Sequence, residues 1–349
     1  MLKFVIIKTL MAFEITGTGR ALPARRVSND ELAMKIDTSD EWIRSHTGIG
    51  ARHLAGEETA ASDLALEAAK KALEMAEPEK SAEEAALSLD MIILATVSPD
   101  FFGTPSTACI VQDKLGAKNA AAMDITVGCT GFIYGLETAA GLLSLNDRRK
   151  RALLIGSEII SKFADWSDRG TCVLFGDGAG AVIVEKTAAP QEGNDRRGLV
   201  RSLLKADGSG AEYLYFNKGG SRFPFKAGET IDKPIHLLMN GQAVYNFAVK
   251  AVTDTINEIL SLEGISIDDV ALIIPHQANA RIVQAAAKRL KVPQEKFYLN
   301  IEEYANTSAA SIPIALDELN RNGKLKRGDL ILMVGFGGGL TFGANLLIW

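Results

Sequence analysis

The sequence predicts an α/β protein made of two similar halves. Short apolar runs recur along the 349 residues, each bounded by Gly, Pro or Asp, and their length suits buried strands. Longer stretches rich in Ala, Leu, Glu and Lys separate these runs and are typical of helices. A third observation is a repeat: strand, helix, strand and small-residue helix follow one another from Asp90 and again from Asp269. Strands that alternate with helices favour parallel sheet.

The individual elements follow from these patterns. Strands are expected over residues 91–97, 152–155, 181–184, 272–274, 330–334 and 346–348. Helices are expected over residues 59–76, 244–262 and 281–290. The acidic segment 77–89 is expected to be a solvated loop or a helix end.

The boundary between the halves is expected in residues 186–198, which have turn composition and no apolar period. This divides the chain into an N-terminal half, 11–190, and a C-terminal half, 191–349. Residues 1–10 precede a better strand and are expected to be an extension. Duplication brings strand ends and helix starts of both halves to one centre, where a catalytic cluster can lie.

Composition narrows the class of protein. The chain has 38 basic and 43 acidic residues, a net charge of −5, so it lacks a chain-wide basic footprint for nucleic acid. Three cysteines and four histidines, without a CxxC or HExxH motif, favour a reducing, cytoplasmic compartment and no metal site. The apolar runs are also shorter than a membrane span.

Cys129 has the sequence context of a nucleophile. It follows a predicted strand and begins a helix, with Gly128 before it and Gly131 after it. Free amide N–H groups and the positive end of the helix dipole favour a thiolate, so we expect a lowered pKa suited to covalent catalysis. The alternative is a small buried apolar residue. Cys109 and Cys172 lack this context and are interpreted as structural.

His276 and Asn306 belong to the second half of the repeat. His276 follows the strand at 272–274, at the carboxyl end where α/β folds bind ligands. Asn306 opens the segment NTSAASIP, where it could also be a helix cap. Beside a thiolate, an imidazole and an amide form a pair of donors for one carbonyl oxygen. The pair suits a carbanion or enolate, although a Cys–His hydrolase is also consistent with these residues.

Eight motifs in order make the chain resemble a known family. They are TSDEWI (38–43), TGI (47–49), GCTGF (128–132), DRGT (168–171), FGDGAG (175–180), PHQAN (275–279), NTSAASIP (306–313) and GFGGGLTFG (335–343). Together they resemble the β-ketoacyl-acyl-carrier-protein synthase III family of the thiolase-like superfamily, from about residue 13 to residue 349.

The resemblance implies a thiolase-like fold with duplicated halves in five αβαβα layers, and a homodimer. It implies that Cys129 is the nucleophile and that His276 and Asn306 complete a Cys-His-Asn triad of the initiating class. The oxyanion hole would be formed by the backbone N–H groups of Cys129 and Gly338. The implied reaction is a decarboxylative condensation of acyl-CoA with malonyl-acyl-carrier protein, through an acyl-Cys intermediate. Its products are 3-oxoacyl-carrier protein, CoA and CO2, and no cofactor is needed.

Further roles also come from the resemblance. Trp42 and Arg169 would hold the adenine end of coenzyme A, by stacking and cation–π contact. Arg281 would meet the carrier protein, with Lys288 and Arg289 on the same face of its helix.

The chain also departs from the family pattern. His46 stands where the family usually has Arg, and Arg44 is expected to replace that contact. Ala305 replaces the usual Gly. Thr104 stands where acetyl-selective relatives often carry Phe, a residue that closes the acyl tunnel from the dimer partner.

Two other functions are compatible with parts of the pattern. One is a related condensing enzyme or acyltransferase of specialised metabolism. The other is an acyl-CoA- or dinucleotide-binding protein without chemistry, suggested by Gly17-Thr-Gly19 and by the glycines at 176–180. Neither segment completes the GxGxxG pattern before a helix, so that signal is weak.

Overall fold

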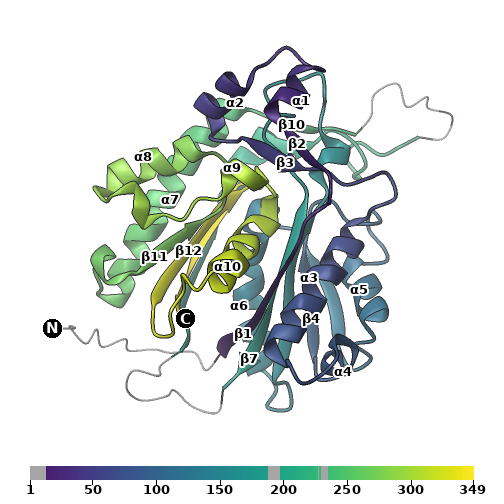
Figure 1. Cartoon of the computed structure of the whole chain (residues 1–349), viewed down its shortest axis with the longest axis vertical. Helices are drawn as coiled ribbons and strands as arrows, with labels where there is room; N and C mark the ends of the chain where they lie inside the picture. Colours follow the sequence, from purple (N-terminus) through teal and green to yellow (C-terminus); the bar gives the residue numbers. More distant parts are fainter. Residues whose placement is uncertain (1–12, 188–196, 227, 229–234) are drawn as a thin grey trace.

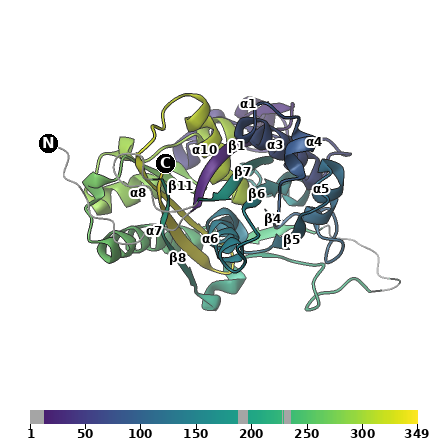
Figure 2. The same cartoon turned by 90° about the horizontal axis from the view of Figure 1, so that it is seen from below.

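The computed structural model describes residues 13–187, 197–226, 228 and 235–349. The expected extension at 1–10 and the expected boundary between residues 190 and 191 lie outside the described residues. Two large sheets lie side by side (Figures 1 and 2).

The first sheet is built entirely from the N-terminal part of the chain. Its order is β1 (Phe13–Ala21), β7 (Gly178–Lys186), β6 (Arg151–Glu158), β4 (Met91–Ala95) and β5 (Ala121–Ile125). Strand β4 is parallel to β5 and β6, whereas β7 is antiparallel to both β1 and β6. The sheet is therefore mixed rather than purely parallel.

The second sheet is built from the C-terminal part. Its order is β11 (Leu272–Pro275), β12 (Leu330–Gly337), β13 (Thr341–Ile348) and β8 (Gly198–Ala206). Only β11 and β12 are parallel. Phe297, in the repeat segment that corresponds to β5, makes an isolated bridge with Ile273 instead of a strand. Short pairs, β2 (Arg26–Ser28) with β3 (Ala51–His53) and β9 (Leu214–Phe216) with β10 (Leu237–Met239), lie outside both sheets.

Helices form three layers around the two sheets. The outer helices are α3 (Ala61–Ala76), α4 (Ala82–Ala86) and α5 (Thr107–Leu115) on the first sheet, and α7 (Gly241–Glu263) and α8 (Ala280–Leu290) on the second. The middle helices α6 (Gly131–Ser144) and α10 (Ser311–Arg321) share one core with strands of both sheets. The order is αβαβα, as expected. Short helices α1 (Asn29–Ala33), α2 (Asp40–Thr47) and α9 (Ile301–Tyr304) lie at the upper end in Figure 1.

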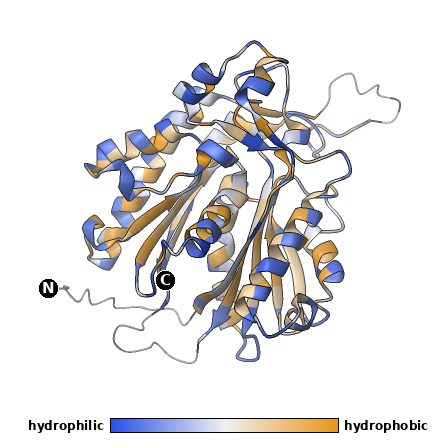
Figure 3. Ribbon diagram, in the orientation of Figure 1, coloured by the Kyte–Doolittle hydropathy of each residue, from blue (hydrophilic) through white to orange (hydrophobic). Residues whose placement is uncertain are grey.

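Burial explains why the middle helices differ from the outer ones. The sequence of α6, GFIYGLETAAGLLS, is apolar on most of its circumference, because sheets pack on opposite sides of it. The outer helix α8 is amphipathic, with polar residues toward solvent (Figure 3). Segment 77–89, expected to be a loop or helix end, contains the short helix α4.

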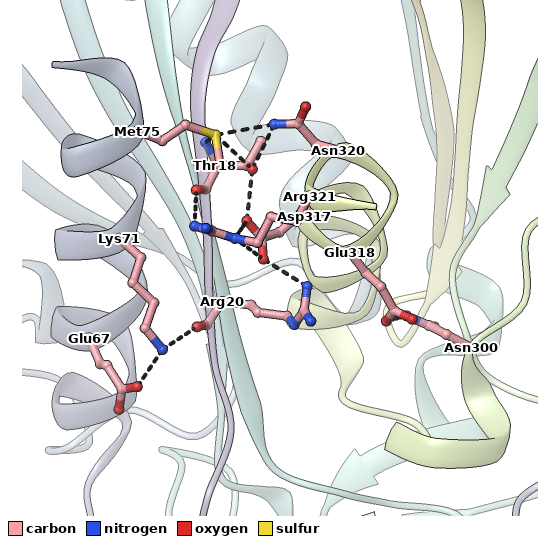
Figure 4. Close-up of polar contacts among 10 residues, drawn as sticks. All are labelled: Thr18, Arg20, Glu67, Lys71, Met75, Asn300, Asp317, Glu318, Asn320 and Arg321. Carbon is pink, nitrogen blue, oxygen red and sulfur yellow. Dashed lines mark hydrogen bonds and ion pairs between the residues drawn. The ribbon is translucent and has the colours of Figure 1, made fainter. Parts of the chain in front are cut away.

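A buried carboxylate fastens the second middle helix to the first sheet (Figure 4). Asp317 of α10 has a fully buried side chain, and its oxygens accept hydrogen bonds from Thr18 Oγ1 at 2.8 Å and from Arg20 Nη1 at 2.9 Å. Arg321, one turn later, donates to Asp317 Oδ1 at 2.9 Å and to the Thr18 carbonyl at 3.2 Å. Helix α10 from the second half is thus attached to β1 of the first.

We predict that Asp317→Ala lowers the free energy of unfolding by about 3 kcal/mol, because two arginines would lose a desolvated partner. The matched control is Asp254→Ala, which removes an exposed ion pair with Lys250 on α7 and should cost no more than about 0.5 kcal/mol. Urea denaturation measures both variants. Equal losses would contradict the role given to Asp317.

Candidate active site

The backbone around Cys129 is built by close contact between the two halves. Cys129 lies in a single 3-10 turn, Gly128–Thr130, directly before α6. A Cβ on Gly337 would lie 2.5 Å from the Cys129 backbone nitrogen, and one on Gly128 would lie 2.9 Å from Gly338 N. Gly128 also has φ 58°. Only glycines permit this approach of the β12–β13 turn to the start of α6.

Two cavities meet at the Cys129 side chain. The first, of about 230 Å³, is lined at its inner end by Cys129, His276, Asn306 and Phe336. The second, of about 280 Å³, has a mostly apolar lining that includes Cys129 and Gly338. Its apolar side chains include Val97, Val127, Ile160, Phe175, Leu214, Phe216 and Leu237. A thiol therefore stands between a cavity with polar groups and an apolar pocket.

His276 is held at the end of β11, as the sequence predicts. Its ring is buried, packs edge-on against Phe336 at 5.3 Å between centroids, and places Nδ1 2.7 Å from Ser311 Oγ. Burial lowers the pKa of His276 to about 3, so the imidazole is neutral. With Nδ1 engaged by Ser311, Nε2 is the nitrogen left for a ligand.

The Asn306 amide has a defined orientation. Its Oδ1 accepts a hydrogen bond from the backbone N–H of Ser308 at 2.9 Å. The amide N–H groups therefore remain for the cavity that Asn306 lines. Since a backbone N–H can only donate, this contact makes Asn306 a donor toward bound substrate.

The expected lowering of the Cys129 pKa is wrong for this structure. Burial raises the pKa of the thiol to about 12, and the negative charge of Glu158 acts in the same direction. The nearby Ser308 hydroxyl opposes these effects and lowers the pKa of the thiol. Desolvation of the thiolate outweighs the favourable position at the helix start. The resting site thus holds a neutral thiol and a neutral imidazole.

The mouth of the first cavity carries the residues expected to hold coenzyme A. Trp42 stacks on His46, with 4.4 Å between ring centroids, and the Arg169 guanidinium lies 5.2 Å from the Trp42 ring centroid. All three line this cavity, and so does Arg281. Arg44 does not: it pairs with Asp40 at 2.8 Å and with Glu302 at 2.6 Å. The expected replacement of a family arginine by Arg44 is therefore not supported, because two carboxylates already bind its guanidinium.

The remaining expected residues lie outside both cavities. Lys288 and Arg289 are exposed on the last turn of α8. Thr104 is exposed in the loop before α5 and lines neither cavity of its own chain. Cys109 is exposed and Cys172 is buried.

Sequence reasoning did not single out the polar groups behind the site. Ser308 and Ser311 lie within the NTSAASIP motif. Ser311 is the first residue of α10 and Ser308 lies three residues before it, but only the fold shows what their side chains contact. Glu158 is the last residue of the buried strand β6. An acidic residue at the end of a buried strand is the sequence signal that could have indicated it. Within the described ranges, no cluster of three or more His, Cys, Asp or Glu is arranged to hold a metal. The same part of the chain contains no helix with the length and apolar character of a membrane crossing.

Comparisons with known proteins agree with this geometry. The solved 3-oxoacyl-[acyl-carrier-protein] synthase III of Aquifex aeolicus VF5 is 44% identical, with a TM-score of 0.85, and covers 97% of this chain and 100% of its own. The priming β-ketosynthase of the R1128 polyketide pathway is 30% identical, with a TM-score of 0.85 and 97% of both chains covered. Fold and site together define a thiolase-like condensing enzyme.

Sequence relatives identify the family within this class. Models of the synthase III family match residues 123–208, and its C-terminal model matches residues 260–349. The β-ketoacyl-[acyl-carrier-protein] synthase III of Caldanaerobacter subterraneus subsp. tengcongensis is 49% identical over 342 residues, 97% of this chain and 98% of the relative. The chain belongs to the 3-oxoacyl-[acyl-carrier-protein] synthase III family, and it is an initiating condensing enzyme of fatty acid synthesis.

We predict that the ring of His276 stays neutral from pH 5 to pH 8, because burial lowers its pKa far below that range. NMR of ring-labelled histidine measures this, and His276→Gln assigns the signal among the four histidines. A free histidine derivative in the same buffer is the titrating reference. A protonation step of His276 within this range would contradict the prediction.

Proposed function

We propose that the enzyme condenses an acyl-CoA with malonyl-acyl-carrier protein in two half-reactions at Cys129. In the first, the Cys129 sulfur attacks the acyl thioester, the acyl group enters the apolar cavity, and CoA leaves through the polar one. In the second, the malonyl group loses CO2 and its carbanion attacks the acyl-Cys. The products are 3-oxoacyl-carrier protein, CoA and CO2. The observation that carries the proposal is the position of Cys129 at the junction of the two cavities.

Each polar group has a separate task in this scheme. The backbone N–H groups of Cys129 and Gly338 serve as the oxyanion hole for the acyl carbonyl, supported by the contact of the β12–β13 turn with Gly128–Thr130. His276 Nε2 and the Asn306 amide donate to the malonyl thioester carbonyl as enolate charge develops there. Both are already oriented by Ser311 and Ser308, so little reorganisation is needed.

Substrate binding is assigned to the mouth of the first cavity. Trp42, His46 and Arg169 form a stacked, cationic surface that suits an adenine ring with phosphate. Arg281 at the same mouth, together with Lys288 and Arg289 farther along α8, offers positive charge to an acidic carrier protein. Since the chain carries a net charge of −5, a local basic surface is needed for this encounter.

We also propose that the enzyme is a homodimer in the cytoplasm. Strand β5 is an edge of the first sheet, and its Met123 and Ile125 are only half-buried. Phe101 and Phe102, in the loop before α5, are 54% and 51% exposed. An apolar sheet edge of this kind is suited to pairing with a second copy. The three free cysteines are compatible with a reducing compartment.

A second candidate is priming of a specialised pathway with another acceptor. The resemblance to the priming β-ketosynthase of R1128 biosynthesis supports it. CO2 release from malonyl-carrier protein with defined acyl donors distinguishes the two candidates. A protein that only binds acyl-CoA would give no covalent adduct in intact mass spectrometry.

We predict that His276→Ala and Asn306→Ala each reduce malonyl decarboxylation and condensation by about a hundredfold, because each removes a donor to developing negative charge. Acylation of Cys129 by acyl-CoA should fall much less. Release of radiolabelled CO2 measures malonyl decarboxylation, and intact mass spectrometry measures acylation of Cys129. Cys129→Ser is the control, since it should abolish the acyl-enzyme. Collapse of acylation with intact decarboxylation would contradict this division of roles.

We predict that Thr104→Phe reduces activity on longer or branched acyl-CoAs and spares acetyl-CoA, because a phenyl ring from the partner copy would shorten the acyl pocket. Each buried methylene adds about 0.8 kcal/mol until the pocket ends. A series of acyl-CoAs of rising length measures the change, and Thr104→Ser is the size-matched control. An unchanged chain-length profile would remove Thr104 from the pocket.

A further inference from the structure

Glu158 is a buried acid to which the scheme above assigns no role. It ends β6, is 0% exposed, and its carboxyl group is surrounded by hydrogen-bond donors. Oε2 accepts from Ser98 Oγ at 2.7 Å, from the Val97 backbone N–H at 3.1 Å and from Thr96 Oγ1 at 3.2 Å. The other oxygen, Oε1, accepts from Ser308 Oγ at 2.9 Å and, at 3.3 Å, from the same Val97 N–H.

The donors on the Oε2 side have fixed directions. Ser98 Oγ accepts from the Ile159 N–H at 2.8 Å, and Thr96 Oγ1 accepts from the Ser98 N–H at 3.0 Å. Their hydroxyl hydrogens are therefore left for the carboxylate. Oε2 is occupied by donors, so an incoming proton would bind to Oε1, on the side of Ser308.

Ser308 stands between Glu158 and the nucleophile. It is 2% exposed, its hydroxyl donates to Glu158 Oε1, and it lines the apolar cavity together with Cys129, close enough to lower the pKa of the thiol. Its backbone is left-handed, with φ 49°, and its N–H holds Asn306. One hydroxyl hydrogen serves one acceptor at a time, so Ser308 can donate to Glu158 and accept from Cys129, or the reverse.

Other titratable groups near Cys129 or Glu158 are already engaged. His276 is neutral, its Nδ1 contacts Ser311, and its Nε2 is needed as a donor to substrate. Asp177 lies next to Gly178, the β7 partner of Glu158, but its oxygens accept from the Ala55 N–H and from the N–H and Oγ of Ser161. Glu158 is one hydroxyl group away from the thiol.

We propose that Glu158 takes up the Cys129 proton through Ser308 during acyl transfer and returns it when condensation releases the sulfur. The S–H bond breaks, its proton binds to Ser308 Oγ, and the original Ser308 proton binds to Glu158 Oε1. The sulfur forms its bond to the acyl carbon, the bond from that carbon to CoA breaks, and the CoA thiolate takes a proton from water. This inference rests on the proposed function.

The return step closes the proton balance. When the malonyl-derived carbanion bonds to the acyl carbon, the Cys129 sulfur leaves as a thiolate and recovers the proton from Glu158 through Ser308. One proton from water is consumed per turnover, matching the carboxylate charge that is lost as CO2 leaves. Glu158 does not touch the reacting atoms and acts on Cys129 only through Ser308.

The protonation equilibrium of Glu158 supports this role. Burial raises its pKa to about 7, so the ionised and neutral forms are both accessible near neutral pH. The ionised form is the one that accepts a proton. Acyl transfer should therefore slow as the pH falls below about 7.

The test is the pH dependence of Cys129 acylation in a single turnover, measured by quenched intact mass spectrometry from pH 5.5 to 9. The wild-type rate should fall below about pH 7. Glu158→Gln should lose this pH step and be about a hundredfold slower at pH 8, within the usual range for losing a proton acceptor. Ser308→Ala should show the same loss of rate and of pH dependence as Glu158→Gln. Glu158→Asp, which keeps a carboxyl group, should again show the fall in acylation rate at low pH.

The controls separate this role from a structural one. Asp177→Asn removes a neighbouring buried carboxylate and should keep the wild-type pH step. If Glu158→Gln does not fold, by circular dichroism, Ser308→Ala carries the same test, because it removes only the hydroxyl. If Glu158→Gln or Ser308→Ala acylates more slowly at every pH but still shows the fall in rate below about pH 7, the inference is overturned. A wild-type enzyme that never forms the acyl-Cys would contradict the proposed function instead.

Discussion

The site depends on the contact between the β12–β13 turn and the start of α6. Backbone from the second half lies so close to Cys129 that no side chain fits at Gly337 or Gly128. This approach places Gly338 next to Gly128, in the lining of the apolar cavity that also contains Cys129. Strands of both sheets and the two middle helices share one core beneath this contact.

Burial at this contact determines the electrostatics of the site. It raises the pKa of Cys129 and lowers that of His276, so both groups are neutral before substrate enters. A neutral imidazole can donate to a developing enolate, which an enzyme of decarboxylative condensation requires. A neutral thiol, in turn, needs a destination for its proton. Desolvation thus connects the nucleophile with the buried Glu158–Ser308 pair.

The middle helix α10 also joins the two halves. Asp317 attaches the end of this helix to β1 through Thr18 and Arg20, while Ser311 at its beginning contacts His276. One helix therefore links the stability of the domain pair to the orientation of a reacting side chain. This arrangement explains why so many polar groups are buried in a layer that is otherwise apolar.

The sequence by itself determined the α/β class and most strands and helices, which follow from local periodicity. The grouping of Cys129, His276 and Asn306 is predicted by the resemblance of their motifs to a known family, and the structure places all three in the lining of one cavity. Only the tertiary structure decided that Arg44 binds Asp40 and Glu302, that the Cys129 pKa is raised, and that Ser308, in the lining of the same cavity as Cys129, donates to the buried Glu158. These contacts and pKa shifts depend on which segments, distant in the sequence, pack against a side chain and remove it from water. A local pattern of neighbouring residues contains no information on that packing.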